Sequence, residues 1–163
     1  MSEKRIAIID DDPFVVAHLK KSLIERIADA QVVGIVDPVA PAAFDVYIVD
    51  KDFNGDSLGQ EVVHRIRSIA PQSLVLAYSA FLDRDYLRTL LVEGCEGAFD
   101  KGSLQEVDAM INVIELYFAS GKRGHDGVEG FGKTVKAISG LVREWNLRLT
   151  NTGSAEAKIF NDV

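Results

Sequence analysis

Four short apolar runs in this sequence are closely followed by side chains that could do chemistry. In chain order, these side chains belong to Asp10, Asp11, Asp50, Ser79 and Lys101. Short runs rich in β-branched residues are typical of strands buried on both faces of a parallel sheet. In open sheets of this kind, ligands bind just beyond the carboxyl ends of the strands. We therefore expect the five side chains to converge on one edge of the sheet.

Such a set of side chains favours the chemistry of phosphoryl groups. Converging carboxylates repel each other unless a cation or protons intervene, and hard oxygen ligands with room for water suit Mg²⁺. Asp10 or Asp11, together with Asp50 and a backbone carbonyl, would leave positions open for water and a phosphoryl oxygen. Lys101 could neutralise one phosphoryl oxygen, and the Ser79 hydroxyl could donate to another. A carboxylate would be the nucleophile, forming an aspartyl phosphate.

The composition favours a soluble protein with one main domain. Its 163 residues are 47% apolar, and the net charge of −7 argues against a nucleic-acid footprint over the whole chain. Cys95 is the single cysteine, which excludes a disulfide framework and a cysteine zinc site. No apolar run approaches the roughly 18 residues that span a membrane, and the first run is too short for a signal peptide. We expect a cytoplasmic protein.

Strand patterns and helix patterns alternate along the first 120 residues. The strands are expected at about 5–9, 32–36, 46–49, 74–78 and 97–99, and the helices at about 13–28, 57–70, 83–94 and 103–120. Residues 37–44 hold two prolines and are expected to form a very short helix or a loop. The alternation predicts an α/β fold with a doubly wound, five-stranded parallel sheet.

Polar residues in front of three helices are predicted to cap them. Asp12 precedes Pro13, which suits the first helical position, so we interpret Asp12 as a helix cap rather than a metal ligand. Ser57 and Ser103 stand before two later helices and are predicted caps as well.

The order of these residues resembles the receiver domain of bacterial two-component response regulators. Residues 8–13, Ile-Ile-Asp-Asp-Asp-Pro, are similar to the acidic-pair motif, and residues 46–50, Val-Tyr-Ile-Val-Asp, to the phosphoacceptor strand. Ala-Tyr-Ser-Ala at 77–80 is similar to the switch segment, and Gly-Cys-Glu-Gly-Ala-Phe-Asp-Lys at 94–101 to the lysine segment. Each motif is weak alone, but four in this order are specific. The resemblance spans residues 5 to about 120 and implies a flavodoxin-like fold.

The resemblance implies a metal site. Asp10 and Asp11 would bind Mg²⁺ together with Asp50. Asp52, two residues further on, matches the position whose backbone carbonyl completes the metal coordination.

It also implies a role in phosphorelay signalling. Asp50 would accept a phosphoryl group from a histidine kinase or a phosphotransfer protein, Lys101 would contact that group, and Ser79 would respond to it. The protein would not be an enzyme in the usual sense, since it catalyses only its own phosphorylation and dephosphorylation. Its change of conformation would control a downstream protein target.

Four features depart from the family pattern. The family usually has Met-Pro where Phe53 and Asn54 stand, and Pro where Gly102 stands. Its switch aromatic usually lies three residues before the lysine, where this chain has Ala98. Phe99 comes one place later, and alternation along a strand would send its side chain to the other face. The helix expected between the second and third strands is nearly absent, so that side of the sheet would be poorly covered.

Two other functions fit part of the pattern. The segment from Asp50 to Asp52 is similar to the Asp-x-Asp of haloacid-dehalogenase-like phosphatases, although in that family the nucleophile strand leads the domain. Turnover of small phosphate esters would distinguish such an enzyme from a receiver. An adaptor that has the receiver fold but is not phosphorylated is the third interpretation. It would have no physical need for the clustered acids.

Residues 122–163 form a separate region in this interpretation, after a receiver at 1–121. A glycine-rich connection leads to a C-terminal helical extension, in which apolar residues repeat on one helical face from Phe131 to Leu149. Because a lone helix of this length is marginal in water, we expect it to pack on the receiver of its own chain or to form a homodimer. We recognise no output domain and expect no direct DNA binding and no membrane contact.

Overall fold

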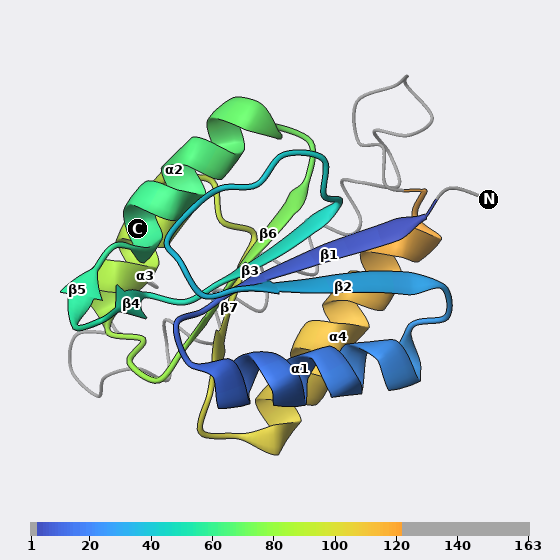
Figure 1. The fold of residues 1–163 in the computed structure, drawn as a ribbon. Helices are drawn as coiled ribbons and strands as arrows, with labels where there is room; N and C mark the ends of the chain where they lie inside the picture. Colours follow the sequence, from blue (N-terminus) through green and yellow to red (C-terminus); the bar gives the residue numbers. More distant parts are fainter. Residues whose placement is uncertain (1–2, 122–163) are drawn as a thin grey trace, which may run out of the picture.

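The computed structural model describes residues 3–121, and its centre is one parallel sheet. The strands are β1 (Lys4–Ile9), β2 (Ala30–Ile35), β3 (Val46–Val49), β6 (Leu74–Ser79) and β7 (Gly97–Asp100). They lie in the order β2-β1-β3-β6-β7, and every neighbouring pair is parallel. Figure 1 shows helices on both sides of this sheet. The predicted five-stranded, doubly wound α/β fold is confirmed.

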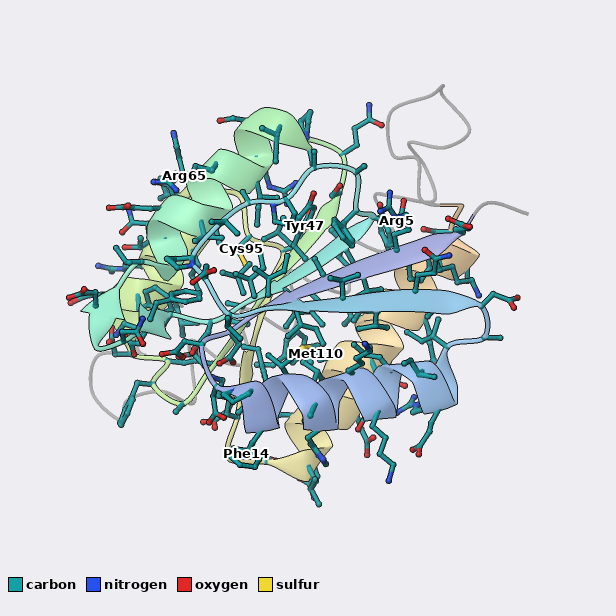
Figure 2. All side chains as sticks on the ribbon, in the orientation of Figure 1. Arg5, Phe14, Tyr47, Arg65, Cys95 and Met110 are labelled. Atoms are coloured by element: carbon teal, nitrogen blue, oxygen red, sulfur yellow. The ribbon has the colours of Figure 1, made fainter. Side chains whose placement is uncertain are left out.

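Two helices pack on each face of the sheet. α1 (Pro13–Arg26) and α4 (Leu104–Ala119) cover one face, and α2 (Gly59–Ile69) and α3 (Arg84–Val92) cover the other. Each layer between helices and sheet is a separate hydrophobic core, and Figure 2 shows Met110 in the first layer and Cys95 in the second. Because β1 and β3 contribute to both layers, their alternate side chains are buried on both faces.

A loop, not a helix, connects β2 to β3 and arches over the sheet on the side of α2 (Figure 1). The Tyr47 hydroxyl donates a hydrogen bond to the carbonyl of Pro41 at 2.6 Å, and the Ser73 hydroxyl donates one to the carbonyl of Phe44 at 2.7 Å. These bonds hold the loop against the sheet, but the Val33 side chain remains 43% exposed. The expected poor cover on this side of the sheet is therefore observed.

The three predicted helix caps have different outcomes. The Asp12 carboxylate accepts a hydrogen bond from the amide of Phe14 at 2.9 Å, which confirms it as the cap of α1. Ser57 does not cap α2, because it lies in a strand and Leu58 occupies the cap position without a side-chain bond. Ser103 occupies the cap position of α4, but its side chain makes no capping hydrogen bond.

A small hairpin, which the sequence analysis did not predict, lies directly after β3. Its strands are β4 (Asp52–Phe53) and β5 (Asp56–Ser57), and they pair antiparallel. The two residues between them, Asn54 and Gly55, have φ angles of 52° and 87°. Positive φ at both central residues is the geometry of a type I′ turn, for which Asn-Gly is a preferred sequence.

Some of the expectations concern residues outside the described range. The glycine-rich connection and the amphipathic helix predicted within 122–163 lie there, so the domain boundary at 121 stays a prediction. Within residues 3–121, no helix is long and apolar enough to cross a membrane.

The close approach of α1 to β2 leads to a test of the core. A Cβ atom at Gly34 would overlap Cγ1 of Val16. We therefore expect Gly34→Ala to lower the free energy of unfolding by about 1–3 kcal/mol, as overpacked cores do. Urea denaturation would measure the change. The pair Val16→Ala and Val16→Ala/Gly34→Ala is the control, since removing the valine methyls should abolish most of the penalty. An equal penalty in both backgrounds would contradict this packing.

Candidate functional site

Three acidic side chains meet where β1 and β3 end. Carboxylate oxygens of Asp10, Asp11 and Asp50 lie within 4.8 Å of one another. The parallel register brings them together, since β1 and β3 are neighbours and the amide of Asp50 donates to the carbonyl of Ile9 at 2.9 Å. Asp10 and Asp50 are buried, with exposed fractions of 2% and 7%, and Asp11 is half-buried.

Lys101 follows the edge strand β7 and brings positive charge to this cluster. Its Nζ lies 2.6 Å from Oδ2 of Asp10 and 2.9 Å from Oδ2 of Asp50. The amide of Lys101 donates to the carbonyl of Ser79 at 3.1 Å, which fixes the start of the turn after β7. The amide of Gly102 donates to Oδ1 of Asp100 at 2.6 Å. A proline at position 102 would lose that donor, which explains this departure from the family pattern.

Burial and charge both act on the ionisation of Asp50. Burial raises the pKa of Asp50 above its ordinary value, the hydrogen bond from Lys101 opposes that rise, and the charge of Asp10 adds to it. Burial alone would lower the pKa of Lys101, but its hydrogen bonds to Asp10 and Asp50 outweigh this effect and raise the pKa. The lysine therefore stays protonated and favours the ionised form of Asp50.

Backbone amides hold the carboxylates of Asp10 and Asp50 in place. Oδ1 of Asp10 accepts a hydrogen bond from the amide of Asp12 at 2.9 Å, and Oδ1 of Asp50 accepts one from the amide of Lys51 at 2.7 Å. Each carboxylate thus uses one oxygen for an amide and the other for Lys101. Hydrogen bonds of this kind, from backbone amides, fix the orientation of carboxylates that ligate a metal.

The remaining predicted site residues lie around this centre. Ser79 is buried at the end of β6, which is the strand between β3 and β7, and its Oγ accepts a hydrogen bond from the amide of Phe81 at 3.4 Å. Asp52 begins β4 and is half-buried. The signalling role of Ser79 and the metal-binding role of the Asp52 carbonyl stay predictions.

The aromatic side chain near the lysine points away from Ser79. Phe99 is fully buried in the core beside α1 and α4, whereas Ala98 is buried in the core on the opposite face. The side chains of Ala98 and Phe99 therefore point to opposite faces of the sheet, as expected. The side chain at the family's usual aromatic position is only a methyl group.

Sequence reasoning missed a contact of the residue that follows Asp50. Nζ of Lys51 lies 3.6 Å from Oδ2 of Asp83 and 4.9 Å from the ring centre of Tyr86. Lys51 thereby joins the segment after β3 to the start of α3. No local signal marks this contact, because Lys51 reads as an ordinary loop residue and its partners lie about thirty positions away in the sequence.

The donor set fits Mg²⁺ on chemical grounds. Asp10, Asp11 and Asp50 offer hard oxygen ligands at one point, and the cluster carries more negative charge than Lys101 can balance. Mg²⁺ is typically held by one or two carboxylates and keeps several waters. These three residues can hold such an ion.

Several solved structures share this fold. The BeF3-activated receiver domain of DrrB from Thermotoga maritima matches with a TM-score of 0.63 at 16% identity, over 72% of this chain and 99% of that chain. A CheY-like receiver domain protein from Methanospirillum hungatei matches with a TM-score of 0.58 at 17% identity, over 70% and 98%. A Burkholderia pseudomallei response regulator, which contains a phosphorylated aspartic acid and a calcium ion, gives 0.58 at 16%, over 98% and 93%. The sequence matches no family model and no curated protein.

The fold and these comparisons agree on a class. A parallel sheet in the order β2-β1-β3-β6-β7 with two helices on each face is the arrangement of a flavodoxin-like α/β protein. Within that class, the described residues have the fold of a response-regulator receiver domain.

The raised pKa of Asp50 predicts how stability depends on pH. Below the ordinary value of 3.8 the carboxyl is protonated in both the folded and the unfolded protein. As the pH rises through the higher pKa of the folded state, ionisation costs stability. Asp50→Asn should therefore raise the melting temperature at pH 7.5 in a metal-free buffer, and the gain should vanish towards pH 4. Scanning calorimetry across this range would measure it.

Asp56→Asn is the matched control, because Asp56 is exposed on β5. This variant should melt close to the parent at both ends of the pH range. If Asp50→Asn instead melts below the parent at pH 7.5, the ion pair with Lys101 outweighs the cost of burying the Asp50 carboxylate.

Proposed function

We propose that the protein is a two-component response-regulator receiver, and that Asp50 accepts a phosphoryl group from a histidine kinase or a phosphotransfer protein. The observation that carries this proposal is the position of Lys101, whose Nζ bridges Asp10 and Asp50 beside the third carboxylate of Asp11. An acid that is ionised, oriented and next to a cation is suited to attack phosphorus. The protein would act in the cytoplasm.

Each residue of the cluster has a defined part in the transfer. An oxygen of Asp50 forms the new bond to phosphorus as the bond from phosphorus to the histidine nitrogen breaks, and the electron pair of that bond stays on the imidazole. Lys101, which already lies 2.9 Å from Asp50, would neutralise a phosphoryl oxygen. A Mg²⁺ ion held by Asp10, Asp11 and Asp50 would supply further charge neutralisation. The strand ends contribute by holding these side chains in position.

The response would begin at Ser79. In the described structure its hydroxyl oxygen accepts the amide hydrogen bond of Phe81, and the side chain of Phe81 is 72% exposed. If the Ser79 side chain rotated to donate to a phosphoryl oxygen, its Oγ would move away from the Phe81 amide and this bond at 3.4 Å would be lost. The segment between β6 and α3 would then change conformation and present a different surface to a downstream protein target.

Phosphorylation of Asp50 is the central prediction. After incubation with acetyl phosphate and Mg²⁺, intact-mass spectrometry should show one phosphoryl adduct that is absent from Asp50→Ala. Omitting Mg²⁺ should strongly reduce the adduct, because the acidic cluster would repel the donor. An adduct that persists in Asp50→Ala would contradict the assignment.

A parallel assay separates a receiver from a phosphatase. The parent protein should not turn over p-nitrophenyl phosphate in many cycles, because the proposed reaction is with its own aspartate. Sustained release of p-nitrophenol that requires Asp50 would favour the phosphatase interpretation instead.

Metal binding should separate the three consecutive aspartates. Asp10→Ala and Asp11→Ala should each weaken Mg²⁺ binding in calorimetry by at least tenfold, since each removes a charged ligand. Asp12→Ala should leave the affinity near that of the parent and instead destabilise α1 by roughly 1 kcal/mol through loss of its cap. Equal loss of affinity in all three variants would contradict this division of roles.

A further inference from the structure

Asp11 differs from its two acidic neighbours in what compensates its charge. Lys101 contacts Asp10 and Asp50. Among the described residues, the one hydrogen bond to the Asp11 carboxylate comes from the amide of Asn54, at 2.8 Å from Oδ2. Repulsion from two nearby carboxylates should turn an unrestrained Asp11 side chain towards solvent. A single backbone amide opposes that rotation.

The hairpin that supplies this amide is anchored at its base and shaped at its tip. Phe53 on β4 is 1% exposed and packs in the core beneath α2 and α3. The amide of Gly59 donates to the carbonyl of Lys51 at 2.8 Å and closes the segment that contains the hairpin. At the tip, the positive φ angles of Asn54 and Gly55 set the type I′ turn that directs the Asn54 amide towards Asp11.

We propose that the β4–β5 hairpin is a positioning element for Asp11, and that its Asn54–Gly55 turn sets the affinity of the acidic cluster for Mg²⁺. The inference rests on the proposed receiver function, because it assumes that the cluster binds this ion. The Asn54 amide occupies one carboxylate oxygen and leaves the other for the metal. Groups that orient a metal ligand in this way typically change metal affinity by about 10–100-fold when they are lost.

Two substitutions at one position test the geometry of the turn. Asn54→Val places a β-branched residue at positive φ, where it is strongly disfavoured. Asn54→Gly keeps an amide and adopts that φ without strain. We expect calorimetry with Mg²⁺ on the full chain to show about tenfold weaker binding for Asn54→Val, and affinity near that of the parent for Asn54→Gly. Gly55→Ala should resemble Asn54→Val, because nothing lies within 4 Å of the added Cβ and only the strain at φ 87° acts.

The contact itself has a direct readout without metal. Amide hydrogen exchange by NMR should be faster at Asn54 in Asp11→Ala than in the parent, whereas Asp37→Ala, at an exposed position in the β2–β3 loop, should leave it unchanged. In metal-free buffer Asn54→Gly should melt close to the parent, and Asn54→Val only slightly below it, because the strained turn is exposed and loses no core packing. Together these results would assign the effect to Asp11 rather than to the stability of the fold.

The outcomes distinguish the inference from the proposed function. A parent that binds no Mg²⁺ would overturn the metal site and the inference with it. If the parent binds Mg²⁺ and Asn54→Val binds equally well, the inference alone fails. It also fails if Asn54→Gly is as weak as Asn54→Val, because the asparagine side chain rather than the turn would then be responsible.

Discussion

The ion pairs of Lys101 are the interactions on which the site depends. Asp10 and Asp50 are almost fully buried, and two buried carboxylates this close would otherwise repel each other strongly. Lys101 reaches them from the turn after β7, although β6 lies between β7 and β3. That reach uses the long stem of a lysine, and the residue at the end of β6 is the small Ser79. The order of the strands therefore determines which residue types the edge can hold.

The parts of the fold that were predicted correctly have local signals. The strands before Asp10 and Asp50 are short runs buried on both faces, and Asp12 caps α1 through bonds within its own turn. Ser57 failed as a cap because it pairs with Asp52 in the hairpin, which fixes its backbone before the helix begins. The hairpin was missed because each of its strands has only two residues, too few to show alternation. The Asn-Gly pair was the one signal that could have revealed it.

The departures from the receiver pattern have physical explanations in this chain. Gly102 keeps an amide donor for Asp100 that a proline would remove. Asn54 and Gly55 form a tight turn, and the proline that the family usually has at position 54 could not adopt the positive φ of Asn54. Phe99 fills the core beside α1 and α4, and a Cβ atom at Gly97 would lie only 3.1 Å from both Leu76 and that ring. Each departure from the family pattern is thus accommodated by neighbouring residues of this chain.

The stability of the fold and the electrostatics of the site are linked through Asp50. Holding this carboxylate ionised inside the protein costs folding free energy, as the raised pKa shows. A fully solvated aspartate would avoid that cost, but water would then screen its interaction with Lys101. Because the site is buried, a charge added at this edge interacts more strongly with the residues at the strand ends. A cation that binds the folded protein alone would recover stability by mass action. The burial of the Asp50 carboxylate, which weakens the fold, therefore also makes the site responsive to added charge.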